Sequence, residues 1–495
     1  GEVGIKRVIN GPMIWSPDSN VLFGPAPNVS NYFCCNGVIP GFSQSGGMGM
    51  LAAEWITKGE THYDMFAWDL TRFGDWCSDK FTKERVRDQY ANRFKIHFPG
   101  EEREAGRPIR KRPAFKYQKE LGGVFGLNYG WEHPLYFDSD TPDTAGFTRQ
   151  DWWKSVRREA LMLRRNVGII DISNFGKYIC RGNGAHEFLD RIFANKIPEK
   201  IGASCLSPII GKMGGISADA TITKINDDTF WVVSSGAAEG FQQRFFNLIE
   251  LDEDTNFTSK SNDYCGFNVA GPKSRDLLQR LSNKDLSKEA WPFFKSGSLA
   301  IAGIECMAMR VSFTGDLGWE LYCEEHDQLA LYEVLIKSAS QIGGGPVGSR
   351  ALMSLRLEKG YGSWGREYSP EYWPHEVGLE RLISNKPDFI NKDKVTDVLS
   401  QPAREKLVVL KLNEADVLRS NADALGGEPI FKDGKGVGRV TSGGYGYSVD
   451  MSLALGFVKG LESGEEVDVM VLGKPHRAII LNEPPFDPES SILRG

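Results

Sequence analysis

The alternation of apolar and polar positions is clearest over residues 310–322. Val311 and Phe313 alternate with polar residues before a glycine-bearing turn at 314–316, and a second apolar run follows. This pattern predicts a strand, a turn and a second strand. Glu320 lies inside the second run, where burial of an ionised side chain is costly unless it is paired or hydrogen-bonded. Alternation alone favours a simpler interpretation, in which Glu320 points to solvent.

A second acid, Asp219, lies in similar surroundings. Gly214 and Gly215 precede it, and a run of small, apolar and β-branched residues at 220–223 follows it. The glycines predict a bend, with Asp219 at the start of a strand over 221–223. The occurrence of two such acids shifts the balance toward a functional interpretation of both.

Similar patterns predict further elements between residue 151 and the end of the sequence. Apolar residues at helical spacing predict helices, and continuous apolar runs predict buried strands. Helices are expected at 151–166, with Asp151 as N-cap, and at 184–197, 274–281, 329–342 and 351–358, and strands at 167–173 and 301–309. From about residue 404, short strands alternate with glycine turns, which predicts a small barrel.

The first part of the chain is predicted to hold short strands, a glycine turn and a helix. Strand-like runs are expected at 4–9 and 21–25, and a short strand followed by a turn at 12–18. The glycine-rich stretch 41–49 leads into a helix at 50–56 that ends near Gly59. Glycines before a helix allow close backbone approach and direct free N–H groups at a ligand. An ordinary strand-to-helix turn explains the same spacing equally well.

Composition and charge narrow the class of protein. The 495 residues are 41% hydrophobic and 25% charged, which predicts about three domains of ordinary globular composition. A net charge of −6 and the lack of a basic stripe argue against a nucleic-acid partner. The basic pairs at 111–112 and 164–165 are expected to be solvated.

Cysteine usage and hydropathy exclude further classes. The eight cysteines lack the close spacing of metal ligands, and Cys34 and Cys35 are adjacent. Neither a zinc site nor a disulfide framework is therefore expected, and a reducing compartment is favoured. No window approaches the roughly 18 apolar residues of a membrane span.

Four motifs, in one order along the chain, resemble the aminomethyltransferase family, the tetrahydrofolate-binding fold of the glycine-cleavage system. They are Gly214–Thr223, Arg310–Tyr322, Leu355–Tyr361 and Gly438–Ser442. With the opening segment, the whole chain resembles the C-terminal part of a dimethylglycine or sarcosine dehydrogenase. The implied fold is α+β: an aminomethyltransferase-like folate-binding domain with a small C-terminal β-barrel, preceded by the tail of an FAD-dependent amine oxidoreductase domain.

The resemblance also implies a division of the chain. Residues 1–75 would close the FAD-dependent oxidoreductase domain, and residues 76–150 would form a connector. Residues 151–398 would form the folate-binding domain, and residues 399–495 the barrel.

The resemblance assigns roles to the two acids and to one aromatic residue. Glu320 matches the family position that binds the donor edge of the pteridine ring, where a buried carboxylate complements amine and amide N–H groups. Asp219 matches the family acid near the folate N5, where it can take a proton as N5 gains a one-carbon unit. Phe313 stands where the family often carries Tyr, so a hydrogen bond is lost while an aromatic wall is kept.

Further folate contacts are implied near the Leu355–Tyr361 motif. Tyr361 and Trp364 are expected to supply stacking surface. Arg356 is expected either to meet an acidic part of folate or to pair with Glu358 or Glu376.

A flavin contact is implied in the opening segment. In flavin-dependent amine oxidoreductases a segment like 25–59 closes the FAD-binding domain, with its glycine turn against the flavin ring. Gly46, Gly47 and Gly49 are therefore expected to form one wall of a flavin site. A strand running into GxGxxG is absent from the sequence, so the FAD site would lie only partly within this chain.

The implied activity is capture of the one-carbon unit that flavin-dependent demethylation releases from an N-methyl amine such as dimethylglycine or sarcosine. The product would be 5,10-methylenetetrahydrofolate. Two alternatives remain open: a flavin-independent, folate-dependent methyltransferase or demethylase, and a non-catalytic regulatory subunit of the same architecture.

The implied partners are the amine substrate and a flavin-bearing N-terminal portion or subunit, and a homo-oligomer is left open. The compartment would be the cytoplasm in a bacterium or the mitochondrial matrix in a eukaryote. Since the sequence opens with Gly1 in an apolar run, we expect a processed product, one subunit of a split enzyme, or a piece that begins within a domain.

Overall fold

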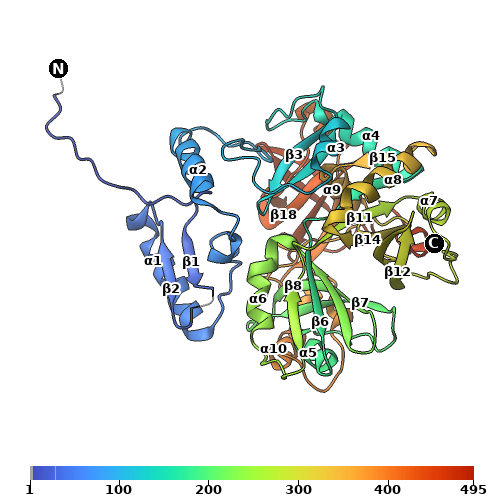
Figure 1. Cartoon of the computed structure of the whole chain (residues 1–495). Coiled ribbons are helices and arrows are strands. Elements are labelled where there is room, and N and C mark those ends of the chain that lie inside the picture. The colour runs from blue at the N-terminus through green and yellow to red at the C-terminus, as the bar shows by residue number, and fades with distance from the viewer. Residues whose placement is uncertain (1–3, 28) are drawn as a thin grey trace. The chain divides into compact units, whose positions relative to one another are not determined.

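The computed structural model describes residues 4–27 and 29–495 (Figure 1). Residues 1–3 and 28 of the predicted opening segment lie outside the described residues. The chain divides into two compact units, the smaller made of residues 1–96 with 103–109 and the larger of residues 97–102 with 110–495.

The smaller unit is built on a two-stranded sheet and two helices. The strands β1 and β2 pair antiparallel, and Phe23, Leu51 and Trp55 are buried together in the core. The elements are β1 (Leu22–Pro25), β2 (Phe33–Asn36), α1 (Gly41–Lys58), the 3₁₀-helix η1 (Leu70–Arg72) and α2 (Asp79–Ala91).

Two of the strands predicted in this unit are wrong, and one is confirmed. Residues 4–9 and 12–18 form no strand, and Ile5, Val8 and Ile9 are exposed. The turn expected at the end of 12–18 is confirmed at residues 17 and 18. A strand is stable only where neighbouring strands pair with it, and none of the described strands pairs with these runs. The run at 21–25 is confirmed as β1.

The glycine turn predicted at 41–49 is also wrong, because α1 begins at Gly41 and includes the whole stretch. Met48, Leu51 and Trp55 follow helical spacing and bury one face of α1, which outweighs the poor helix propensity of the glycines. The predicted end is confirmed: Gly59 has a φ of 78°, and its N–H donates to the carbonyl of Trp55.

The larger unit contains two sheets, a closed barrel and one separate hairpin, with helices around them (Figure 1). The five-stranded sheet has the order β10-β6-β9-β8-β7, and the six-stranded sheet has the order β12-β13-β14-β11-β5-β15. The barrel closes in the order β16-β19-β18-β17-β20-β21, which confirms the small barrel expected from about residue 404.

The strands of this unit are β3 (Gly123–Asn128), β4 (Trp131–Phe137), β5 (Gly168–Asp171), β6 (Gly176–Arg181), β7 (Ser204–Ile210), β8 (Ile216–Lys224), β9 (Thr229–Ser234), β10 (Asn256–Ser259), β11 (Tyr264–Ala270), β12 (Ser296–Ile301), β13 (Ile304–Met309), β14 (Gly318–Glu324), β15 (Gly345–Val347), β16 (Lys406–Leu412), β17 (Pro429–Lys432), β18 (Lys435–Gly446), β19 (Met451–Val458), β20 (Glu466–Val471) and β21 (Lys474–Ile480).

The α-helices are α3 (Phe115–Glu120), α4 (Trp152–Arg165), α5 (Ala185–Ile192), α6 (Glu239–Phe246), α7 (Ser274–Leu281), α8 (Gln328–Ser340), α9 (Ser349–Glu358), α10 (Lys392–Leu399), α11 (Glu414–Ser420) and α12 (Ser491–Arg494). The predicted helices at 274–281, 329–342 and 351–358 are confirmed as α7, α8 and α9. The helix predicted at 184–197 stops at Ile192. Asp151 precedes α4 but makes no capping bond, because its own φ of −60° and ψ of −31° are already helical.

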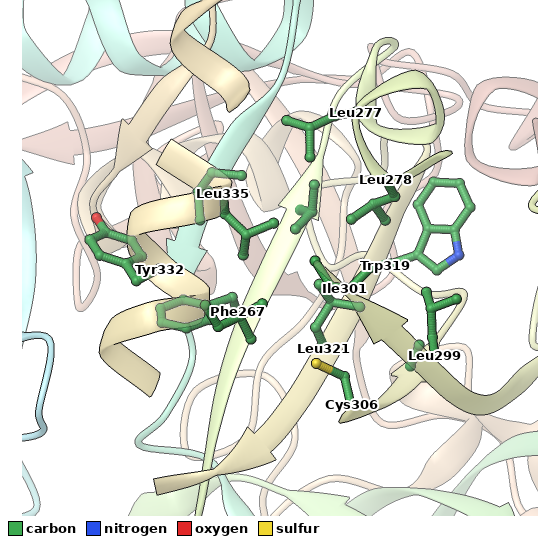
Figure 2. Close-up of a cluster of buried hydrophobic side chains, with 14 of the residues drawn as sticks. Phe267, Leu277, Leu278, Leu299, Ile301, Cys306, Trp319, Leu321, Tyr332 and Leu335 are labelled. Carbon is green, nitrogen blue, oxygen red and sulfur yellow. The ribbon is translucent and has the colours of Figure 1, made fainter. Parts of the chain in front are cut away.

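The six-stranded sheet is apolar on both faces because each face is covered. Side chains alternate along β11 and β14, so Phe267 and Leu321 face one core (Figure 2). Tyr332 and Leu335 of α8 pack into that core, with the rings of Phe267 and Tyr332 stacked at 5.0 Å. The opposite face packs against the five-stranded sheet.

We call that second cluster the inter-sheet core. It contains Ile170, Met309 and Tyr322 of the six-stranded sheet, Ile172 just after β5, Trp231 and Val233 of the five-stranded sheet, and residues of α4 and α9. The rings of Trp231 and Tyr322 lie 5.6 Å apart and join the two sheets.

The strand predicted at 310–313 is wrong, since β13 ends at Met309 and residues 310–317 form a loop. The guanidinium of Arg310 is buried over the ring of Trp319, at 4.7 Å, and donates to the carbonyl of Leu493 at 3.0 Å. The hydroxyls of Ser312 and Thr314 bond each other across the loop at 2.8 Å. These side-chain contacts replace the ladder bonds of a strand.

Candidate functional site

Glu320 is buried in the middle of β14, with 8% of its surface exposed. Strand pairing places it opposite Met309 on one side and Asn268 on the other. Its side chain shares a face with Tyr322, two residues along, and therefore with the inter-sheet core. The solvent-facing interpretation from alternation is wrong, because both faces of this strand are covered.

The carboxylate of Glu320 has a hydroxyl partner. Tyr322 donates its hydroxyl to Oε2 at 2.7 Å. Burial raises the pKa of Glu320 from 4.5 to about 7, and the bond from Tyr322 offsets only part of that rise. In the described part of the chain, Glu320 forms no ion pair.

Asp219 lies in the middle of β8 rather than at the start of the strand. The bend before it is confirmed: a Cβ on Gly215 would lie 2.0 Å from the carbonyl oxygen of Pro370, so only glycine fits there. Burial raises the pKa of Asp219 from 3.8 to about 6. Asp219 likewise forms no ion pair among the described residues. Its negative charge also acts on the nearby Tyr368, whose pKa is raised mainly by burial.

The register of β8 shows which way Asp219 faces. Thr221 lies opposite Val233, and Thr223 lies opposite Trp231. Alternate residues of a strand share a face, so Asp219 faces the same way as Val233 and Trp231, toward the inter-sheet core. The structure therefore brings the two acids onto the facing sides of two packed sheets.

The aromatic residues connect these two sides. The rings of Phe313 and Tyr361 stack at 6.0 Å with an interplanar angle of 18°. Trp364, three residues beyond Tyr361, donates its Nε1–H to the carbonyl of Ser217 at 2.9 Å. Because Ser217 is two residues before Asp219, the loop 361–364 extends from the side of Phe313 to the strand of Asp219.

Arg356 holds this loop in place. It pairs with Glu367 at 3.1 Å and donates to the carbonyl of Tyr361 at 2.8 Å and to the hydroxyl of Ser442 at 2.7 Å. Glu367 also accepts from the hydroxyls of Thr441 and Ser442. We call this set of residues 356, 367, 441 and 442, of which all but the half-buried Thr441 are buried, the loop hub.

Both predicted partners of Arg356 are wrong, because other arginines occupy them. Glu358 pairs with Arg164 at 2.8 Å, and Glu376 pairs with Arg404 at 2.7 Å. The prediction that the basic pairs are solvated is wrong for Arg164, which is buried between Asp316 and Glu358. It is also wrong for Arg112, whose guanidinium lies 3.6 Å from the centre of the Trp131 ring.

Sequence reasoning missed three residues of the site. Asn268 could have been found, because it is the one amide on a strand of apolar, aromatic and small residues, and Tyr322 could have been found, because it is two residues from Glu320 on the same strand. Tyr368 gave no such signal, since only the fold brings it to Asp219.

The residues around Glu320 fit the donor edge of a pteridine. Asn268, 3% exposed, donates its Nδ2–H to the carbonyl of Trp319 at 3.3 Å, and its buried Oδ1 has no hydrogen-bond partner among the described residues. Oδ1 and the carboxylate of Glu320 are thus neighbouring acceptors that await donors. Amine and amide N–H groups would satisfy both.

The described glycines do not fit a flavin wall in the same way. Gly46, Gly47 and Gly49 lie within α1, and a Cβ on any of them would meet no atom within 4 Å. Their assignment to FAD stays a prediction, and no chemistry is derived from it. Among the described residues no group of three or more His, Cys, Asp or Glu side chains could hold a metal ion.

Three family models match the chain. "GCVT N-terminal domain" covers residues 114–386, and "Glycine cleavage T-protein C-terminal barrel domain" covers residues 406–487. "FAD dependent oxidoreductase central domain" covers residues 58–111. The first of these alone spans more than half of the chain.

Curated proteins match over nearly the whole chain. Mitochondrial dimethylglycine dehydrogenase of Mus musculus is 34% identical, over 97% of this chain and 56% of that protein. Mitochondrial sarcosine dehydrogenase of the same species is 26% identical, over 100% of this chain and 59% of that protein. The mitochondrial pyruvate dehydrogenase phosphatase regulatory subunit of Mus musculus is 28% identical, over 93% of this chain and 54% of that protein. The chain therefore spans little more than half the length of these relatives.

Among solved structures, the glycine cleavage system aminomethyltransferase T from Bartonella henselae has the same fold. The TM-score is 0.66 at 22% identity, over 77% of this chain and 99% of that one. The expected α+β fold with a C-terminal barrel is confirmed. No described helix combines the length and the apolar character that a membrane crossing requires.

Proposed function

Because the chain belongs to the GCVT family, with both its N-terminal domain and its C-terminal barrel, we propose that it forms the tetrahydrofolate-dependent part of an N-demethylating oxidoreductase. It captures the one-carbon unit that flavin-dependent oxidation releases from an N-methyl amine such as dimethylglycine or sarcosine. The product is 5,10-methylenetetrahydrofolate.

One observation carries this proposal. Two buried acids, Asp219 and Glu320, lie on facing sides of two packed sheets, and neither forms an ion pair in the described part of the chain. Burial of an acid without a cation costs free energy, so a ligand that donates hydrogen bonds there would recover part of that cost.

The two acids have different tasks. Glu320, with Asn268 beside it, accepts hydrogen bonds from the donor edge of the pteridine and fixes its orientation. Bound tetrahydrofolate supplies N5 and N10, which take up the carbon. Asp219 accepts the proton that N5 loses as the new bond forms. The leaving group is water when the carbon arrives as formaldehyde, and the demethylated amine when it arrives as an iminium.

The raised pKa of Asp219 suits its task. With a pKa of about 6, Asp219 is mainly ionised at neutral pH yet close enough to it to exchange protons efficiently. Enclosure between the sheets keeps water and protein amines away from a reactive carbon.

Calorimetric titration of the chain with tetrahydrofolate tests the anchor. Glu320→Gln keeps the shape and removes the charge. Binding should weaken about 10- to 150-fold, since a hydrogen bond to a charged group contributes roughly 1.5–3 kcal/mol. Glu324→Gln, at the exposed end of the same strand, is the matched control and should bind normally. Unchanged affinity in Glu320→Gln would show that the anchor assignment is wrong.

Asp219→Asn tests the proton acceptor. It should keep folate affinity within a few-fold while slowing the uptake of formaldehyde above the uncatalysed background by about 10²- to 10⁴-fold, the usual range for a general base. Asp227→Asn, an exposed acid in the turn after β8, should leave the rate unchanged. A normal rate in Asp219→Asn would remove Asp219 from the mechanism.

A regulatory scaffold is the second candidate, because one relative is named as a regulatory subunit. A folded chain that does not bind tetrahydrofolate would favour it. The flavin-independent methyltransferase is a weaker candidate, since the FAD-dependent oxidoreductase model matches residues 58–111. A yellow chromophore in the purified native complex would exclude the flavin-independent alternative.

The proposed partners follow from the proposed reaction. They are the N-methyl amine and a flavin-bearing portion or subunit, and a homo-oligomer is a further possibility to be tested by light scattering. The relatives are named as mitochondrial, so we propose the mitochondrial matrix for a eukaryotic source and the cytoplasm for a bacterial one.

A further inference from the structure

A cavity of about 420 Å³ opens at the seam between the two sheets. The seam is closed by backbone contacts: Ala203 bridges to Lys295, and the N–H of Ser296 donates to the carbonyl of Gly202 at 2.8 Å. A volume of this size lies within the range of roughly 300–1,000 Å³ that small-molecule sites occupy.

Three lysines line this cavity, which we call the lysine pocket. They are Lys224, Lys284 and Lys295, and none of them forms an ion pair in the described part of the chain. Lys284 donates to the carbonyl of Ser298 at 2.5 Å. Lys295 reaches over the backbone of Gly202, where an added Cβ would lie 2.7 Å from Nζ. The net charge of the chain is −6, but three ammonium groups without an ion pair among the residues that the structure describes make the surroundings of this cavity positively charged.

The remaining walls are hydroxyl-bearing and apolar. Thr223 and Ser296 line the pocket, and the hydroxyl of Ser204 bonds to both of them, at 2.7 and 2.6 Å. Trp291 and Met307 supply apolar surface. Charged groups on the rim and apolar groups within are the usual features of a site for a small charged molecule.

The lysine pocket is separate from the folate site. Met307 lies opposite Tyr322, whereas Glu320 lies opposite Met309, two residues along the strand. Thr223 of the pocket lies opposite Trp231. The Trp231 and Tyr322 rings, both buried, therefore stand beside the pocket. Asp219 lies four residues from Thr223 along β8, a separation of roughly 13 Å at about 3.3 Å per residue.

We propose that the lysine pocket binds a small dianion with a short apolar body, in which carboxylate or phosphate oxygens meet the ammonium groups. Lysine binds such groups as a mobile point charge. The neighbouring hydroxyls of Thr223 and Ser296 complete the polar contacts, and Trp291 and Met307 pack on the apolar body.

The test is calorimetric titration of the whole chain, at constant ionic strength, with inorganic phosphate and, separately, with succinate. We expect saturable binding of at least one anion. Phosphate alone would indicate a phosphorylated ligand, and succinate alone a dicarboxylate. The double variant Lys284→Gln/Lys295→Gln should weaken binding about tenfold or more, the equivalent of one hydrogen bond to a charged group.

The matched control is Lys411→Gln/Lys474→Gln, which makes the same change of charge on the barrel and should bind the anion normally. A second variant keeps all three lysines: Ser298→Phe, opposite Met307, fills the pocket and should also abolish anion binding. Tetrahydrofolate affinity should be normal in every variant, because the two sites are separate.

Three outcomes would overturn the proposal. They are a folded wild-type chain that binds neither anion saturably, an equal loss in the barrel control, and anion binding that survives Ser298→Phe.

Discussion

The chain buries carboxylates in two regions that differ in what neutralises them. At the candidate folate site, the hydroxyl of Tyr322 is the one hydrogen-bond partner of Glu320 in the part of the chain that the structure describes, and burial raises the pKa of Glu320 to about 7. In the loop hub, Glu367 is fully buried but pairs with Arg356 and accepts from two hydroxyls. The first arrangement leaves acceptor capacity for a ligand, whereas the second uses its capacity within the protein. The acid that has neither a cation nor a full set of donors is therefore the one that can still bind a ligand.

Breaking the loop hub should have the largest effect on stability. Arg356→Leu leaves Glu367 buried without its cation, and removal of one partner of a buried pair costs roughly 3–5 kcal/mol. Chemical denaturation of the folded chain measures this loss. Lys406→Ala, in a surface pair with Glu462 whose side chains are 54% and 76% exposed, should cost no more than about 1 kcal/mol. Equal losses of stability in the two variants would show that the buried ion pair contributes no more than the surface ion pair.

Neutralising Glu320 should stabilise the folded chain, whereas breaking the loop hub destabilises it. Since its folded-state pKa is raised from 4.5 to about 7, the folded chain retains a proton that the unfolded chain releases in this interval. Stability from this group therefore falls as pH rises from about 4.5 to about 7 and stays low above that.

Glu320→Gln removes this dependence. Its stability relative to the wild type should rise between pH 5 and pH 8, by up to about 3 kcal/mol at roughly 1.36 kcal/mol per pKa unit. Thermal unfolding across this pH range measures the difference. A constant difference across the range would show that Glu320 is ionised in the folded chain throughout.

Tyr322→Phe sharpens the comparison by removing the single hydroxyl partner. Without that bond the pKa of Glu320 should rise further, so the pH at which tetrahydrofolate binding reaches half its maximum should move upward. Affinity at pH 7 should fall about fivefold, in line with the roughly 1 kcal/mol of one hydrogen bond. Tyr332→Phe, a buried tyrosine in the other core, should leave that pH unchanged. If the pH of half-maximal binding does not change in Tyr322→Phe, the hydrogen bond from Tyr322 does not contribute to folate binding.

The smallest expected effect concerns the aromatic wall. Phe313→Tyr keeps the stacking on Tyr361 and adds a hydroxyl that can bond the ligand. Folate affinity should rise about threefold, near the lower end of the roughly 0.5–1.5 kcal/mol of one hydrogen bond. Phe293→Tyr, a half-buried ring in another loop, is the control and should not change the calorimetric affinity. A weaker complex in Phe313→Tyr would indicate that the wall has no room for the hydroxyl.

The parts of the fold that local patterns determine could be predicted from the sequence. Helix α7 and the barrel follow from the spacing of apolar residues and turns. The strand that carries Glu320 was also predicted. The burial of Glu320 could not be predicted from alternation, because alternation does not tell whether both faces of a strand are covered.

The rest depends on contacts that are distant in the sequence. Arg356 was expected to pair with Glu358 or Glu376, yet its partners are Glu367 and Ser442. The glycines of α1 follow a turn pattern locally, but burial of Met48 and Trp55 decides in favour of a helix. The local sequence therefore predicts neither the partners of Arg356 nor the helix through these glycines.

The loop hub has a consequence for the order of events during biosynthesis. Glu367 obtains two of its hydrogen bonds from Thr441 and Ser442, which leave the ribosome more than seventy residues later. Until then, the segment carrying Tyr361 and Trp364 lacks part of its anchor. A nascent chain, which folds from its N-terminal side, therefore completes the aromatic wall only after the barrel strand β18 has emerged. The proposed folate site is thereby complete only after the barrel strand has been made.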